Sequence, residues 1–205
     1  MKTFYALAAV ATLAAATLAD SAHAALIMDT GTPTGSSTPL SLDAIDFAAA
    51  EFSLGAGQTI TSIQGYFTAG TSNPGDTFTV ALYAGAAAPD VRATPIWSGQ
   101  ATFQADGWNG LSKLSISGLA AGNYWAAFEV GILDSAMNLA LPIGAPNNGA
   151  TPALAYAFNN GDGYNINSGF NFGAQVSAVP LPGALVLLMS GLFSLGGLRR
   201  KSLNA

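Results

Sequence analysis

The sequence contains no cysteine and a single histidine, His23. Without cysteine the chain can form no disulfide framework and no Cys-His catalytic pair. The histidine lies in a segment that we expect to be removed, so the remaining chain can build neither a Ser-His-Asp triad nor a His-ligated zinc or copper site. These absences exclude several enzyme classes. They leave an oxidising compartment open, because secreted domains of this size can fold without disulfides.

Charged residues are also scarce, at 8% of the chain, and basic ones are the rarer kind. Between Ala25 and Ala178 two bases, Arg92 and Lys113, stand against ten acids, a net charge of −8. The acids are Asp29, Asp43, Asp46, Glu51, Asp76, Asp90, Asp106, Glu129, Asp134 and Asp162. Nucleic acids and anionic membranes are bound through basic surfaces. We therefore expect no nucleic-acid partner, whereas neutral glycans, cations and other proteins remain as partners.

The N-terminus has the three parts of a secretion signal. Lys2 supplies a basic start, an apolar region runs from Phe4 to about Leu18, and Ala22-His23-Ala24 offers small residues at the positions that a signal peptidase recognises. We expect residues 1–24 to be a signal peptide that is cleaved between Ala24 and Ala25. The alternative is an uncleaved N-terminal anchor.

The C-terminus carries a second apolar segment. Residues 183–198 contain no charge and would form a helix roughly 24 Å long, a little short of the hydrocarbon core of a bilayer. The basic residues Arg199, Arg200 and Lys201 follow and can reach the headgroups. Because basic ends stay in the cytoplasm, the chain before Val179 is expected outside. An ordinary single-span anchor or a buried core helix are the alternatives.

Directly before this helix stand Val179, Pro180, Leu181 and Pro182. This motif, the apolar helix and the basic end, in that order at the C-terminus of a chain with a secretion signal, resemble the sorting signal of the PEP-CTERM family. Leu181 stands where the name of the family has Glu. The resemblance implies recognition by an exosortase, a membrane peptidase or transpeptidase of Gram-negative bacteria that make exopolysaccharide. It also implies an inner-membrane intermediate, removal of the helix, and delivery to the cell surface or extracellular matrix.

The segment between the two signals has the length of one domain and a strand-like pattern. In Thr77–Tyr83, apolar Phe78, Val80 and Leu82 alternate with smaller or polar residues, as in a half-buried strand. Similar segments are Phe47–Leu54, Thr59–Ala69, Ile96–Gln104, Leu111–Leu119, Asn123–Val130, Met137–Ile143, Leu154–Asn159 and Gly169–Val176.

Turn-forming sequences separate these segments, among them Ser72–Asp76, Asp106–Gly110 and Asn159–Gly163. Thr30–Pro39 is expected to be a flexible loop. No segment has the period of an amphipathic helix. The pattern predicts an all-β domain over residues 25–178, an antiparallel β-sandwich of jelly-roll or Greek-key type.

Paired carboxylates are the remaining route to an enzyme, because a glycosidase needs an acid and an ionised partner about 5 to 9.5 Å apart. Glu51 and Glu129 are the candidates, since both lie on predicted strands. Trp125 and Glu129 share one face of Asn123–Val130 and could form a sugar site. A solvated Glu129 beside a partly covered Trp125 is the simpler interpretation. We expect no catalytic residue and no enzymatic activity.

Aromatic residues offer a better binding hypothesis. Sugar-binding sandwiches stack sugar rings on exposed aromatic side chains. The candidates are Trp97, Trp108 and Trp125, with Tyr66 and Tyr83 beside them. Trp108 is expected within the turn-like stretch Asp106–Gly110, which favours exposure, although tryptophan is highly buried on average. Binding of exopolysaccharide is therefore an alternative to a structural or adhesive role.

Calcium is the last chemical possibility. Asn159–Gly163 offers several oxygen ligands in one tight loop, but it lacks the spacing of an EF-hand and a closing glutamate. The same residues are what a turn requires. We therefore expect no metal ion and no cofactor.

Overall fold

The structure is a computed structural model that describes residues 23–34, 39–89, 94–131, 133–136, 138–147, 151–167 and 169–180. Most of the expected signal peptide lies outside these residues. So do Leu181, Pro182, the expected helix at 183–198, and the basic residues Arg199, Arg200 and Lys201. Residues Ala24–Val179 form one compact unit. Nowhere in the described ranges is there a helix that is long and apolar enough to cross a membrane.

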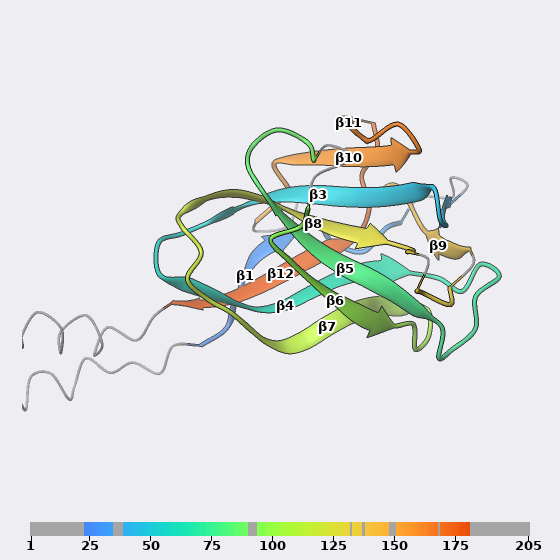
Figure 1. The fold of residues 1–205 in the computed structure, drawn as a ribbon, viewed down its shortest axis with the longest axis horizontal. Helices are drawn as coiled ribbons and strands as arrows, with labels where there is room; N and C mark the ends of the chain where they lie inside the picture. The colour runs from blue at the N-terminus through green and yellow to red at the C-terminus, as the bar shows by residue number, and fades with distance from the viewer. Residues whose placement is uncertain are drawn as a thin grey trace, which may run out of the picture. The chain divides into compact units, whose positions relative to one another are not determined.

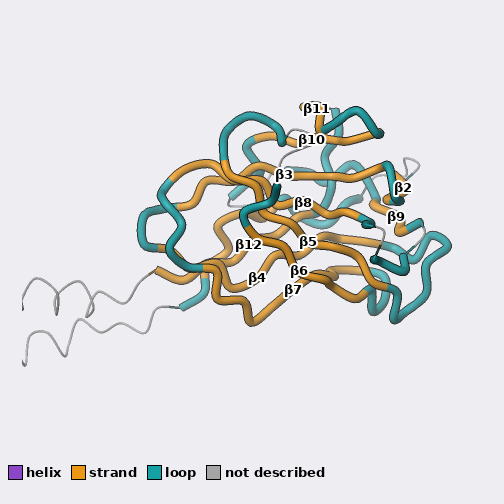
Figure 2. Tube along the Cα trace, viewed as in Figure 1, coloured by secondary structure: helices purple, strands orange, loops and turns teal. Residues whose placement is uncertain are grey.

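The described chain is all-β, and neighbouring strands pair antiparallel (Figures 1 and 2). The strands are β1 (Ala25–Asp29), β2 (Leu40–Leu42), β3 (Asp46–Leu54), β4 (Gln58–Phe67), β5 (Thr77–Ala84), β6 (Trp97–Thr102), β7 (Gly107–Ile116), β8 (Gly122–Glu129), β9 (Leu139–Leu141), β10 (Ala155–Asn160), β11 (Tyr164–Ile166) and β12 (Ala174–Pro180).

Two larger sheets make up the domain. One has six strands in the order β11-β10-β3-β8-β5-β6, and the other has four in the order β1-β12-β4-β7. A small pair, β2 and β9, lies beside them. Successive strands often belong to different sheets, so most neighbours within a sheet are distant in the sequence. The first strand, β1, pairs with the last, β12.

The core lies between the two larger sheets. Phe67 on β4 contacts Phe78 on β5 with ring centroids 5.1 Å apart, and Phe128 on β8 at 5.4 Å. Gly65 on β4 leaves room for these rings, because a Cβ there would lie 2.7 Å from Phe67. All three phenylalanines are fully buried. Strand alternation thus directs one side chain in two toward the opposite sheet.

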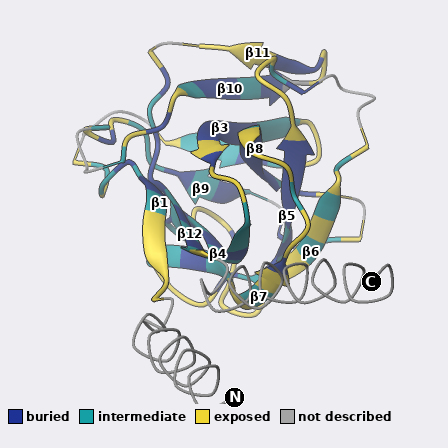
Figure 3. Cartoon of the chain, turned by 90° about the vertical axis from the view of Figure 1, so that its left-hand side faces the viewer, coloured by how far each residue is buried: buried dark blue, intermediate teal, exposed yellow. Residues whose placement is uncertain are grey.

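The outer face of the six-stranded sheet carries a second apolar cluster. Ala81, Ala127, Ala49 and Ala157 are successive register partners across β5, β8, β3 and β10, and all are fully buried. Tyr83, Trp125 and Tyr164 complete the cluster. Strand β5 is accordingly buried on both faces, whereas β11 and the start of β1 are exposed (Figure 3).

Each expected strand range overlaps an observed strand, but two boundaries are wrong. Asp106–Gly110 is not a turn, because the bend covers only residues 105–106 and Gly107 already pairs with Phe67. Gly169–Val176 becomes a strand only at Ala174. Before Ala174, Phe172 makes only an isolated bridge to Ile143. Phe170 and Phe172 both pack in the core, and this spacing of two residues gave the segment the sequence pattern of a strand.

The expected flexible loop at Thr30–Pro39 is held at its start. Thr30 is fully buried, and its Oγ1 donates to the carbonyl of Phe172 at 2.8 Å. The same oxygen accepts from the backbone N–H of Ala174 at 2.8 Å. Strands β1, β2 and β11 were not expected, because segments of three to five residues are too short to show a clear alternation.

Candidate functional site

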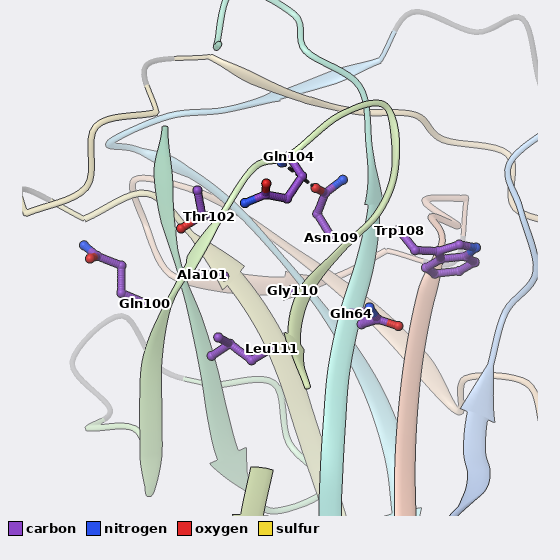
Figure 4. Close-up of a pocket in the computed structure, with 9 residues that line it drawn as sticks. All are labelled: Gln64, Gln100, Ala101, Thr102, Gln104, Trp108, Asn109, Gly110 and Leu111. Atoms are coloured by element: carbon purple, nitrogen blue, oxygen red, sulfur yellow. Dashed lines mark hydrogen bonds between the residues drawn. The ribbon is translucent and has the colours of Figure 1, made fainter. Parts of the chain in front are cut away.

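A cleft of about 330 Å³ lies on the side of the domain where an edge of one larger sheet approaches an edge of the other. Strand β6 is an edge of the six-stranded sheet and β7 an edge of the four-stranded sheet, and both contribute to its walls. The lining residues, drawn in Figure 4, are Gln64, Gln100, Ala101, Thr102, Gln104, Trp108, Asn109, Gly110 and Leu111. The volume falls in the range of small-molecule sites.

Trp108 supplies the aromatic wall of this cleft. It is the second residue of β7 and pairs in register with Tyr66 on β4. The two ring centroids are 5.6 Å apart with an angle of 87° between the planes, so the edge of one ring meets the face of the other. The indole is half-buried. It is therefore held in place and keeps part of its surface open.

The residues before Trp108 are held by Asn109. Its Nδ2 donates to the carbonyl of Ala105 at 2.8 Å and to that of Gly107 at 2.9 Å, and its Oδ1 accepts from the backbone N–H of Gln104 at 2.8 Å. Asn109 is buried, at 4% exposure. The three bonds fix the bend between β6 and β7, and with it the backbone that carries Gln104 and Trp108.

The polar lining of the cleft is uncharged. Gln64, Gln100, Gln104 and Thr102 bring amide and hydroxyl groups that can both donate and accept hydrogen bonds. Gln100 already donates to Oδ1 of Asp134 at 3.1 Å. None of the nine lining residues titrates near neutral pH, so the cleft holds no acid or base for catalysis. It is suited to binding.

The other two tryptophans are placed differently. Trp125 is fully buried in the outer cluster, and its Nε1 has no hydrogen-bond partner. It offers no ring face to a ligand. Trp97 begins β6 and packs against the main core. Of the three tryptophans named from the sequence, only Trp108 lines the cleft.

Glu129 lies on the outer face of the six-stranded sheet, at the end of β8. Its Oε1 accepts hydrogen bonds from the hydroxyls of Tyr83 and Tyr164, both at 2.8 Å. Burial raises the pKa of Glu129, and the nearby Asp134 adds to the rise, while the two tyrosine bonds oppose it. Burial and the neighbouring Glu129 raise the pKa values of Tyr83 and Tyr164. Tyr83 is only 9% exposed and belongs to this cluster, so its ring is not accessible for a sugar to stack on.

The two carboxylates proposed for hydrolysis do not form a pair. Glu51 is the register partner of Trp125, four residues before Glu129 on β8. At about 3.3 Å per residue the two glutamates stand about 13 Å apart along the sheet, more than the separation that hydrolysis requires. Glu51 instead accepts from Nδ2 of Asn123 at 2.8 Å. The arrangement does not support a glycosidase site.

The expected turn at Asn159–Gly163 begins too early, because Asn159 and Asn160 end β10 and only residues 161–163 form the β10–β11 turn. Oδ1 of Asn159 accepts from the backbone N–H groups of Gly161 at 2.8 Å and Gly163 at 3.0 Å, so this oxygen is committed to the turn. Among the residues that the structure describes, no group of three or more His, Asp or Glu side chains is arranged to hold a metal ion.

Comparisons with models of protein families, with curated proteins and with solved structures found no match.

Proposed function

We propose that this chain is an exported, non-enzymatic protein of the cell surface or extracellular matrix. Its N-terminal signal is removed by signal peptidase, and its tail is recognised by an exosortase at Val179–Pro182. The observation that supports this proposal is the pairing of β1 with β12, in which Ala25 is the register partner of Ala178. Both proposed processing regions therefore border neighbouring strand ends, and loss of both segments would leave the sheets nearly intact.

Among the residues that the structure describes, the two glutamates considered for hydrolysis are not assembled as a pair, and this supports the non-enzymatic part of the proposal. Glu129 is held by two tyrosines, Glu51 by Asn123, and the two stand too far apart to act together. The cleft at Trp108 has no titratable lining. A structural or adhesive role requires no catalytic group.

The experiment is the intact mass of the protein recovered from the producing cells and from their medium. We expect loss of residues 1–24 and of the segment beyond the Val179–Pro182 motif. Replacing Pro180 and Pro182 by alanine should leave the tail on the chain and keep it in the membrane fraction. Leu133→Ala, at a side chain that is 89% exposed, is the matched control and should be processed normally. Matrix protein that still carries the apolar tail would contradict sorting.

The finer fold class that we propose is a Greek-key sandwich. Strands β8, β5 and β6 are neighbours in one sheet, and β7 follows β6 at the adjoining edge of the other. The spatial order of the four strands is β8-β5-β6-β7. The last of them in the sequence, β8, lies beside the first, β5, and this is the Greek-key order.

A second candidate function is binding of polysaccharide. The observation that favours it is the cleft in which the half-buried indole of Trp108 stands beside uncharged amide side chains. Sugar sites combine these two features, an apolar stacking surface and a few polar groups that fix orientation. Electrophoresis of the full chain through native gels that contain matrix polysaccharide tests it. Retardation is the expected result, and free migration in every such gel would sink the idea.

A further inference from the structure

We propose that the cleft binds an uncharged polysaccharide, with one sugar ring stacked on Trp108 beside Gln64 and a further ring of the same polymer held by Gln104. This inference rests on the polysaccharide-binding function above, and it names the ligand class and the residues that select it.

The first step of the argument is the fixed orientation of Trp108. Tyr66 contacts the indole nearly at right angles, at 5.6 Å between centroids, and the side chain of Asn109 fixes the backbone that precedes Trp108. A preorganised ring loses little conformational freedom when a ligand binds. Gly110, two residues further along β7 and on the same face, carries no side chain that would fill the space beside the ring.

The second step concerns the free amides. The side-chain amides of Gln64 and Gln104 make no hydrogen bond to any described residue. Each has an oxygen that accepts and a nitrogen that donates. Sugar hydroxyls also do both, so one amide can bind two neighbouring hydroxyls. Gln100 is less available, because its Nε2 already donates to Asp134.

The third step is the charge around the cleft. The lining residues carry none, and the nearest flanking acids are in the adjoining turns. Asp134 is hydrogen-bonded to Gln100 of the lining, and Asp106 directly precedes Gly107-Trp108. In the described part of the chain the only Lys or Arg is Lys113. Lys113 lies on β7 two residues beyond the lining residue Leu111, so among the described residues a uronic-acid polymer would meet two nearby acids and one base. We expect net repulsion of such a polymer, strongest at low salt. The site therefore selects neutral chains.

The experiment measures affinity of the purified full chain for two sets of polymers at low and physiological salt. Dextran, mixed-linkage β-glucan and galactomannan form the neutral set, and alginate, polygalacturonate and hyaluronan form the acidic set. We expect at least one neutral polymer to bind, and the acidic set to bind more weakly, with the difference shrinking as salt rises.

Variants of the cleft test which residues are responsible. Trp108→Ala should weaken neutral binding about tenfold, because it removes the apolar surface on which the sugar ring stacks. Gln64→Ala with Gln104→Ala should weaken it several-fold. Leu133→Ala is the control and should bind as wild type. Where Trp108→Ala fails to fold, Trp108→Phe keeps an aromatic ring and should show a smaller loss.

The outcomes separate the two proposals. Absence of binding to every polymer would overturn both polysaccharide binding and this inference. Binding that Trp108→Ala and the double glutamine variant leave unchanged would keep the function but remove the cleft as its site. Equal or tighter binding of the acidic set would overturn the selection of neutral chains.

Discussion

The hydroxyl of Tyr83 on β5 donates a 2.8 Å hydrogen bond to Oε1 of Glu129 on the neighbouring strand β8. Tyr164, from β11 at the far edge of the same sheet, donates to the same oxygen. The rings of the two tyrosines also meet edge to face, with centroids 6.2 Å apart. One carboxylate thus joins three strands across the outer face of the six-stranded sheet.

Glu129→Gln should change how stability depends on pH. Burial raises the pKa of Glu129 in the folded state above its unfolded value. A raised carboxyl pKa stabilises the fold below the unfolded pKa, and this contribution is lost as pH rises through the folded pKa. Glutamine keeps an acceptor for both tyrosines and carries no charge. The wild type should therefore lose stability relative to the variant over the range that begins near the ordinary carboxyl pKa of about 4 and ends at the raised pKa of Glu129, measured by urea unfolding. A constant difference over that range would contradict the assignment.

Tyr164→Phe should destabilise the domain by about 1 to 3 kcal/mol, because it removes a hydrogen bond to a largely buried charged group. The tyrosine bonds lower the pKa of Glu129, so their loss should raise it further. Tyr66→Phe is the matched control, since the Tyr66 hydroxyl makes no hydrogen bond to a described residue; its change should stay within about 0.5 kcal/mol. In a double-mutant cycle, Tyr164→Phe should cost less when Glu129 is already glutamine.

Phe67→Ala should cost about 3 to 5 kcal/mol in the free energy of unfolding. Its fully buried ring contacts Phe78 and Phe128 across the interface between the sheets, so truncation leaves a cavity in the main core. Chemical denaturation measures the effect, with Leu133→Ala as an exposed control. A loss below about 1 kcal/mol would mean that the sheets repack around the missing ring.

Gly110→Ala should destabilise the pairing of β4 and β7 by about 1 to 3 kcal/mol. An added Cβ would overlap the backbone carbonyl oxygen of Ile63 and lie 2.8 Å from the Cα of Gln64, so the backbone itself must move. Gly131→Ala is the control, because its Cβ would make only an ordinary 3.5 Å contact with Asp134. Thermal unfolding of the two variants should differ clearly; equal midpoints would contradict the close approach.

Local alternation was enough to predict most of the strands. In β8 it separates Tyr124, Ala126 and Phe128 from Trp125, Ala127 and Glu129, and these two sets do enter different clusters. The alternation of side chains along β8 cannot indicate that both faces of its sheet are covered by other residues. Trp125 is fully buried because Tyr83 and Tyr164, from strands 40 or so residues away on either side, reach the same face.

The candidate site was predicted only in part. The sequence indicated Trp108 as an exposed aromatic residue because it was expected within a turn at Asp106–Gly110. The structure instead places it on β7, half-buried, and at the cleft. The sequence did not indicate the glutamines, since Gln64 belongs to an expected strand far in the sequence from the segment that holds Gln100 and Gln104. They line one cleft because β6, at the edge of one sheet, lies close to β7 and its neighbour β4 in the other sheet.

By itself the sequence determined the all-β class and the scarcity of catalytic residue types, because both follow from side-chain period and composition. The proposed export signals also come from the sequence alone. Only the tertiary structure decided which tryptophan is accessible, why Glu51 and Glu129 cannot act together, and where the free amides gather. Those properties depend on the register between strands that are distant in the sequence. The side-chain period within each strand does not indicate that register.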